Sequence, residues 1–443
     1  MPPTLRQSNY EADRYVRQRR RAKLALSLAL VLLAGMVVAS VIIYRSWKRQ
    51  QLRLALAHTT EHIDSVDHDR LREARPLIDE ALGGSVNPDA ALFARGAQVE
   101  FYLWLYYSGD RATLNQAKRL LEDAELRGAT EPETRFTRAL WEGFLGDPSI
   151  TLEVADELAE LPGVRPDRPY LLRGIAAAAT GDHALAVRHL EKATSLRPTA
   201  LNHLAFAREA ERLGARIDAV DQQEAILEIV PDHMAATVDL ALLRAGEPTA
   251  ATYLDDVETV LKTHDGRVPP RVMGRVFAAK ASGLSAQGDH RGSTRWHERA
   301  LEEDADNPDL LRSYAHELRI RGDLSAARAQ LARIETQRPY SGDALGELAL
   351  IAYLQDRPDL IETRLDDFPE RARRGAAYRL AEGLLELTRG EANTAADVLA
   401  GLPHDLWAGE VRLLLGDAQL AAGKPVEARK SYVEARRQLE RQR

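Results

Sequence analysis

A recurring glycine, often followed by an acidic residue, constrains this chain more than any other feature of its sequence. It returns with a period of about 34 residues. One interval is twice as long, and Asp356 stands at its midpoint, where a further turn is expected. A fixed period of this size is typical of stacked two-helix units, each contacting mainly its neighbours. The glycines are Gly109, Gly146, Gly181, Gly214, Gly246, Gly288, Gly322, Gly390 and Gly423.

The stretch around Gly181 shows how one unit is built. Apolar and small residues recur at helical spacing on both sides of this glycine, which predicts a helix, a tight turn and a second helix. Gly181 can take the left-handed conformation that ends the first helix. Asp182 can cap the second by accepting its free amide hydrogens, and Pro198 ends that helix. The unit is therefore a helical hairpin.

This unit resembles the tetratricopeptide repeat, a family with small or apolar residues at six fixed positions of the unit. Good copies begin at residues 308 and 409, and weaker copies near 200, 274 and 376. Degenerate copies cover 90–125, 132–162, 232–263 and 342–370. The resemblance implies an all-α, right-handed solenoid of about ten repeats over residues 90–443, ending in a capping helix. In the unit counted from Asp167 the matching residues are Gly174, Gly181, Ala186, Leu190, Ala193 and Pro198.

An uncharged apolar segment at residues 24–44 predicts one transmembrane helix. At 1.5 Å per residue it would span roughly 31 Å, enough to cross a hydrocarbon core of about 30 Å. Residues 1–23 would form a basic tail, and residues 45–89 a helical linker or degenerate first repeat. A cleaved signal peptide is the alternative, but its apolar core is normally shorter and ends in a small, polar cleavage region. Here the apolar run leads directly into Arg45.

The basic residues on the two sides of this segment give an orientation. Seven Lys or Arg residues lie in 4–23 and four in 45–64. Because basic residues are retained on the cytoplasmic side, the difference favours a cytoplasmic N-terminus. We therefore expect the repeat domain to be exported, and the opposite orientation stays open. The resemblance to bacterial single-anchor repeat proteins implies an inner-membrane protein, whose exported domain would be periplasmic.

Composition excludes several function classes. The net charge is −7, so no global basic field suggests a nucleic-acid partner. The chain has no cysteine, which rules out disulfides and thiolate metal sites. No glycine-rich phosphate loop and no catalytic triad spacing is present in the sequence. We expect no enzyme activity and no cofactor.

Two local motifs leave alternatives open. His58 and His62 fall in an H-x-x-E-H pattern that could hold zinc in a metal-dependent hydrolase, although a solvated helix face is the simpler interpretation. The aromatic segment 101–107 predicts either a helix buried between neighbours or a contact with a partner or membrane surface.

The resemblance also implies a concave groove lined by positions 2, 5, 9 and 12 of each unit's first helix. Basic groove residues could bind a carboxylate or an acidic peptide segment, whereas a solvated charged face is the alternative for each of them. No chaperone-type carboxylate clamp is present, since Leu201 and Leu204 occupy two of its positions. The candidate partner-binding residues are Arg208, Glu211, Arg275, Arg312, His316, Arg319 and Tyr353.

Together these features predict a non-catalytic, membrane-anchored scaffold or adaptor that binds proteins or peptides. The chain resembles bacterial single-anchor tetratricopeptide proteins that assist envelope assembly, secretion or cytochrome maturation. A self-assembling structural protein that forms homo-oligomers is the main alternative, and a metal-dependent hydrolase is the other.

Overall fold

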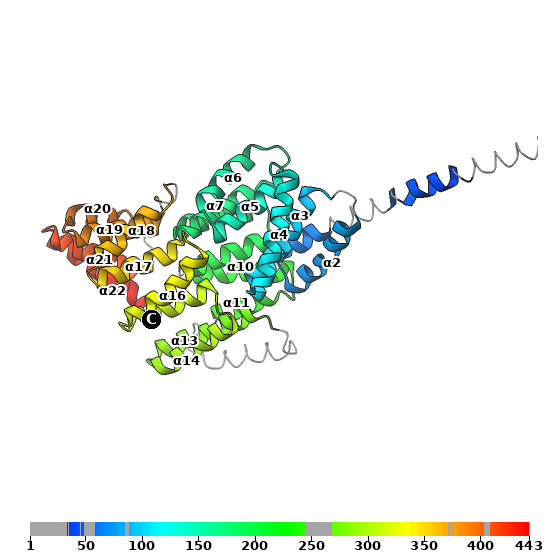
Figure 1. Cartoon of the computed structure of the whole chain (residues 1–443). Helices are drawn as coiled ribbons and strands as arrows, with labels where there is room; N and C mark the ends of the chain where they lie inside the picture. Colours follow the sequence, from blue (N-terminus) through cyan, green and yellow to red (C-terminus); the bar gives the residue numbers. More distant parts are fainter. Residues whose placement is uncertain are drawn as a thin grey trace, which may run out of the picture. The chain divides into compact units, whose positions relative to one another are not determined.

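The computed structural model describes residues 33, 35–44, 46–47, 58–84, 88–213, 215–244, 268–370, 373, 375–402 and 408–442. The chain divides into two compact units, residues 1–58 and 59–443. In the described part of the chain every regular element is a helix (Figure 1). The all-α prediction is therefore confirmed for these residues.

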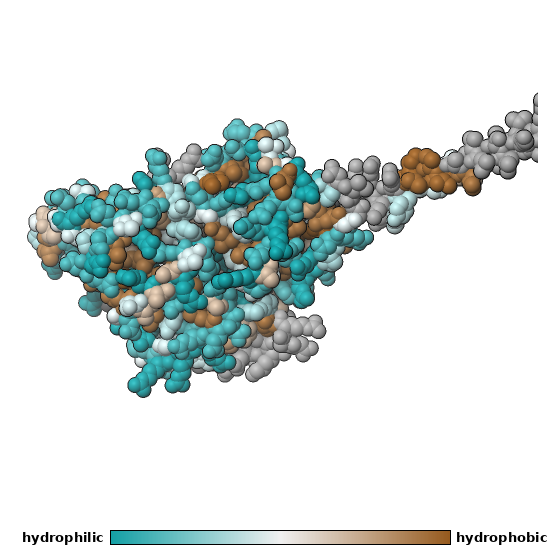
Figure 2. Space-filling model, viewed as in Figure 1, coloured by the Kyte–Doolittle hydropathy of each residue, from teal (hydrophilic) through white to brown (hydrophobic). Residues whose placement is uncertain are grey.

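The first unit contains the predicted membrane segment. Of residues 24–44, only Leu33 and 35–44 lie within the described residues, where they are helical with exposed apolar side chains (Figure 2). Among the residues that the structure describes, no helix is long and apolar enough to cross a membrane. The rest of the predicted segment, residues 24–32 and 34, lies outside them.

The second unit is a succession of helices joined mostly by tight turns. Helices pair in chain order, and the degenerate copies at 90–125, 132–162 and 342–370 form pairs like the better ones. This is a tetratricopeptide-like helical repeat. The helices are α2 (His68–Gly84), α3 (Ala90–Leu103), η1 (Trp104–Ser108), α4 (Arg111–Gly128), α5 (Pro132–Leu145), α6 (Pro148–Glu160), α7 (Asp167–Ala179), α8 (His183–Leu196), α9 (Ala200–Arg212), α10 (Arg216–Ile229), α11 (Met234–Arg244), α13 (Pro270–Ala286), α14 (His290–Glu303), α15 (Pro308–Ile320), α16 (Leu324–Gln337), α17 (Gly342–Leu354), α18 (Pro358–Asp367), α19 (Ala376–Thr388), α20 (Ala392–Ala400), α21 (Ala408–Ala421) and α22 (Pro425–Gln442).

The periodic glycines form the turns between paired helices. Six of them have positive φ, between 65° and 86°. Asp356 has φ 55° at the midpoint of the long interval, which confirms the turn expected there. Gly146 differs, with φ −129°, and a side chain at that position would overlap the Glu142 carboxylate. The six glycines are Gly109, Gly181, Gly288, Gly322, Gly390 and Gly423.

At several turns the acidic residue caps the next helix, as predicted for Asp182, whereas Asp323 and Glu391 make no side-chain cap. The Asp182 carboxylate accepts a hydrogen bond from the Leu185 amide at 3.0 Å. Asp110, Asp147 and Asp289 cap α4, α6 and α14 in the same way. Such caps satisfy amides that have no partner within the helix, each contributing about 1 kcal/mol.

Small residues in the first helix of a pair let the second helix approach closely. A methyl group added at Gly174 would lie 2.6 Å from Leu190 Cδ2, and one at Gly383 would lie 2.9 Å from Leu399 Cδ2. Leu190 and Leu399 are fully buried. The small residues therefore recur in the sequence wherever the two helices of a pair pack too closely for a larger side chain.

The aromatic segment 101–107 is buried throughout, as the first of its two interpretations predicted. Its second half forms the π-helix η1, and Tyr107 donates a 2.6 Å hydrogen bond to the Val66 carbonyl. A π-helix changes the backbone hydrogen-bond pattern of a helix. Here the Leu105 carbonyl accepts a hydrogen bond from Arg271, 166 residues further along the chain.

Such long-range contacts show that later repeats return to earlier ones. Helix α13 packs on η1, and α17 packs on α7. At the second contact the backbone of Gly342 lies against the Thr180–Gly181 turn so closely that no side chain would fit. A turn glycine of one repeat therefore also serves as a docking surface for a distant one.

We expect Gly174→Ala to destabilise the protein by about 1–3 kcal/mol, because the added methyl would overlap Leu190 and overpacking outweighs the gain in helix propensity. Gly283→Ala in α13 is the matched control, since nothing lies within 4 Å of its added methyl. It should stabilise by up to about 1 kcal/mol. Urea unfolding of both variants measures the difference, and equal effects would contradict the close-packing argument.

Candidate functional site

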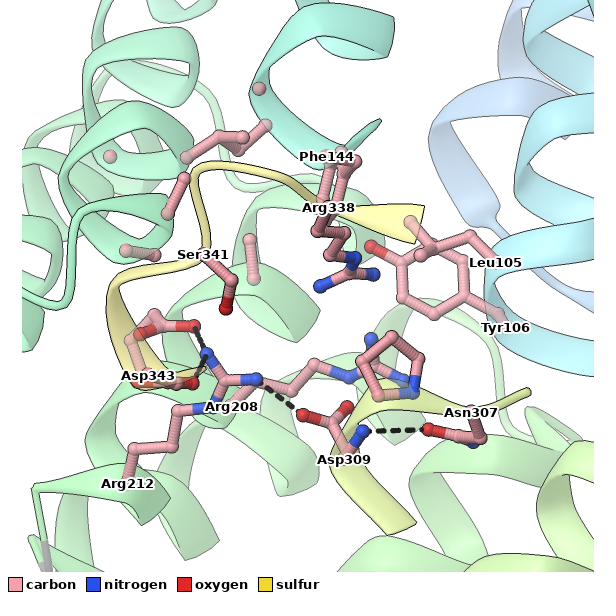
Figure 3. A pocket seen from close by; sticks show the side chains of 18 of the residues that line it. Leu105, Tyr106, Phe144, Arg208, Arg212, Asn307, Asp309, Arg338, Ser341 and Asp343 are labelled. Carbon is pink, nitrogen blue, oxygen red and sulfur yellow. Dashed lines mark hydrogen bonds and ion pairs between the residues drawn. The ribbon is translucent and has the colours of Figure 1, made fainter. Parts of the chain in front are cut away.

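The most distinctive polar region of the second unit is a cavity where the returning repeats meet. Its volume is about 90 Å³. Residues from η1, α9, α13 and the segments that open α15 and α17 line it, with Arg338 from the end of α16 (Figure 3). Its charged lining residues are Arg208, Glu209, Arg212, Arg271, Arg275, Asp309, Arg338 and Asp343.

Arg212 joins three carboxylates from three repeats. Its guanidinium donates to Asp309 Oδ1 at 2.5 Å and lies 3.3 Å from Glu209 Oε1 and 3.5 Å from Asp343 Oδ2. Asp309 and Asp343 each lie at the start of a helix, where a negative charge also meets the positive end of the helix dipole. Arg212 therefore fastens α9 to the beginnings of α15 and α17.

His183 connects the same carboxylates from the other side. Its two ring nitrogens lie 2.5 Å from Glu209 Oε2 and 2.9 Å from Asp343 Oδ1, and its side chain is only 4% exposed. Burial opposes the charged imidazolium, but the carboxylates of Asp343 and Glu209 outweigh it and raise the pKa of His183 to about 9. His183 is therefore a second cation in this network at neutral pH.

Two arginines of α13 form the opposite wall. Arg271 donates to Asp304 at 2.7 Å and to the Leu105 carbonyl at 2.8 Å. Its guanidinium lies over the Trp104 ring. Arg275 pairs with Asp239. Both side chains are largely buried, and both are anchored by carboxylates behind the cavity wall.

Arg208 and Arg338 face the cavity without such a carboxylate. Arg208 stacks on the Tyr106 ring at 4.5 Å, and burial and the nearby Arg275 lower its pKa. Arg338 points into the cavity near Tyr106 (Figure 3). Burial lowers the pKa of Arg338 to about 10, with Asp309 opposing and Arg212 and Arg271 reinforcing the shift.

A second polar surface lies toward the C-terminal end. Arg319 is 6% exposed and joins Glu347 at 2.7 Å to Glu410 at 2.8 Å, which links α15, α17 and α21. His316 lies 3.3 Å from Glu347 and is 44% exposed. Tyr353 is half-buried against the hydrophobic core of α17–α21.

The predicted groove residues thus fall into two groups. Arg208 and Arg275 line the cavity, where the chain's own repeats close over them, while Glu211 is exposed nearby on α9. Arg319 and Tyr353 lie on the C-terminal surface with His316, and Arg312 lies between the groups, 3.7 Å from Asp343. Partner binding by any of them stays a prediction.

Several residues of the cavity were missed from the sequence. Asp309 and Asp343 follow Arg275 at successive intervals of 34 residues, at position 2 of their units, so the repeat register contained a signal for both. Arg212, Arg338 and His183 lie outside the four groove positions. Their recruitment depends on how distant repeats meet, which the register does not describe.

The structure adds no further ligand group to the H-x-x-E-H motif of His58 and His62 among the residues that it describes. His58 is exposed, and within the described ranges no three His, Asp or Glu side chains are placed to hold a metal ion. The cavity itself is lined by charged residues, most of which are paired with one another or with carboxylates behind the wall.

No protein-family model matches the sequence, and no curated protein matches it. Solved structures of similar fold include an IFIT1 monomeric mutant with Gppp-AAAA (14% identity, 87% of this chain and 99% of that chain, TM-score 0.38). The APC/C hetero-tetramer Cut9–Hcn1 (14%, 82% and 83%, 0.38) and yeast Tom70 (12%, 86% and 91%, 0.36) also match. At these scores the likeness supports no inference beyond the helical repeats already described.

We expect Arg212→Met to destabilise the protein by about 3–5 kcal/mol, because it leaves Asp309 and Asp343 without their shared cation. Arg188→Met is the control, since Arg188 is exposed on α8 and should change stability by less than about 0.5 kcal/mol. Chemical unfolding measures both. Similar small effects would show that Arg212 does not hold the repeats together.

The raised pKa of His183 gives a pH dependence of known sign. Since the folded pKa of about 9 exceeds the ordinary value of 6.5, the stabilisation is complete below about pH 6.5 and is lost as the pH rises through about 9. The stability difference between wild type and His183→Gln should therefore shrink from pH 6.5 to 9.5. For His189→Gln on the same helix it should stay flat, because burial lowers the pKa of His189. Thermal unfolding across this pH range distinguishes the two.

Proposed function

We propose that this protein is a non-catalytic, membrane-anchored scaffold that holds a segment of a protein partner on the concave side of its C-terminal repeats. The repeat architecture supports this, because stacked helix pairs build extended surfaces suited to binding other chains. The uncharged segment 24–44 supports the anchor.

The observation that carries the proposal is a pair of exposed leucines at groove positions of the last repeat. Counted from Gly409, positions 5 and 12 hold Leu413 and Leu420, which are 45% and 55% exposed. A lone exposed leucine is ordinary on a protein surface. Two of them on one face, at the positions that the repeat family turns toward its ligands, favour an apolar partner segment.

Side chains on neighbouring helices extend this surface beyond α21. Asp417, between the leucines on α21, accepts a 2.8 Å hydrogen bond from Tyr432. Burial and the nearby Asp417 raise the pKa of Tyr353, which places that tyrosine beside α21. His316 adds a half-exposed polar group on α15. The surface therefore combines apolar contacts with a few hydrogen-bonding groups, as a peptide-binding groove requires.

The upstream part of the concave face is unsuited to an extended peptide. There Arg208, Arg212 and Arg275 are held against other repeats, and the cavity between them is about 90 Å³. We therefore assign partner binding to the surface formed by His316, Tyr353, Leu413 and Leu420. The partner would belong to a complex of the cell envelope. A cytoplasmic N-terminus with an exported repeat unit remains the orientation that the basic residues favour.

Photocrosslinking in native membranes tests this assignment. A photoreactive residue at Leu413, Leu420 or His316 should yield a recurrent crosslink to one partner protein, identified by mass spectrometry. The same residue at Arg328, exposed on α16, is the control and should not. The compartment of the crosslinked partner would also report the membrane orientation.

Two results would contradict the proposal. Crosslinks only between copies of this chain would favour a self-assembling structural protein. Equal crosslinking from Arg328 and the three groove positions, or none from the groove, would show that this face does not select a partner.

A further inference from the structure

Three guanidinium nitrogens around the central cavity have no acceptor. Arg271 Nη2, Arg275 Nη1 and Arg338 Nε are buried and make no hydrogen bond with any residue that the structure describes. All three arginines line the cavity, and the Arg271 side chain is only 4% exposed. Buried charged donors without partners are strongly disfavoured. The cavity lining therefore carries guanidinium donors that the chain's own acceptors do not satisfy.

The charges of the lining point the same way. Five arginines and three carboxylates line the cavity. The carboxylates of Glu209, Asp309 and Asp343 are all engaged by Arg212, and two of them also by His183. This leaves Arg208 and Arg338 facing the cavity with aromatic rings as their close neighbours. Positive charge is therefore in excess on the side of the cavity nearest Tyr106 (Figure 3).

We propose that this cavity binds a small oxyanion, a phosphate or carboxylate group, between Arg208, Arg271, Arg275 and Arg338. Guanidinium groups present pairs of N–H donors whose geometry matches both kinds of group. The cavity volume of about 90 Å³ leaves room for one small anionic group. The low dielectric of a buried site strengthens each charge interaction.

Such an anion would connect parts of the chain that are far apart in sequence. It would contact α9, α13 and the end of α16, beside the Arg212 ion pairs that already join α9 to α15 and α17. Because it would bind only when these repeats have met, it would stabilise the closed arrangement by mass action. The site does not depend on the proposed C-terminal groove.

Inorganic phosphate is the first probe, added to the full-length chain in detergent at pH 7.5 and constant ionic strength set with NaCl. Thermal unfolding should show a saturable rise in Tm of about 2 °C or more. Arg338→Gln should weaken the phosphate effect about tenfold or more, while leaving the circular dichroism spectrum unchanged. Arg328→Gln, on the exposed side of α16, should respond as wild type does. A parallel titration with acetate distinguishes a phosphate site from a carboxylate site.

Arg208→Gln provides a second, independent variant if Arg338→Gln does not fold. The absence of a saturable response to both phosphate and acetate in the wild type would overturn the proposal. An undiminished response in either folded variant would overturn it too, because it would place the anion elsewhere. Since groove crosslinking is measured separately, failure of one proposal leaves the other standing or falling on its own result.

Discussion

The ion pairs of Arg212 with Asp309 and Asp343 are the constraint on which the arrangement of the repeats depends. In a solenoid each unit contacts its neighbours, and nothing in that local packing requires distant repeats to touch. Here one guanidinium joins acidic residues that begin two later helices, 97 or more positions along the chain. His183 holds two of the same carboxylates. Arg212, His183 and Asp343 are mostly buried and Asp309 is half-exposed, so removing Arg212 leaves the carboxylates poorly compensated.

The contacts between distant repeats divide the residues at the predicted groove positions into two groups with different surroundings. Around Arg208 and Arg275 the face is covered by η1 and by the turns of later repeats, and a small charged cavity remains. Beyond Arg319, which joins α15 and α17 to α21, leucines and half-exposed polar groups stay accessible. Residues at the predicted groove positions thus line a charged cavity in one part of the chain and an exposed surface in another.

The glycines have two roles that become visible only when repeats are compared. Most of them supply the left-handed turn within a helix pair, and Asp356 shows that the turn persists where glycine is replaced. The backbone of Gly342, from a distant repeat, also packs directly against Gly181. A periodic residue can therefore be required locally for conformation and again globally for close approach, and the period alone does not separate these requirements.

From the sequence alone one can predict the helix pairs, their period, several of their caps and the close packing within each pair. These follow from local chemistry: turn glycines, capping aspartates and small residues opposite leucines. The resemblance to the repeat family also placed Arg208 and Arg275 at groove positions. The tertiary structure was needed to bring Arg212, Arg338 and His183 close to these two arginines. It also places Arg319 between Glu347 and Glu410. Those partners meet through small rotations accumulated from repeat to repeat. Such rotations depend on the packing of every pair, which no single period or motif encodes.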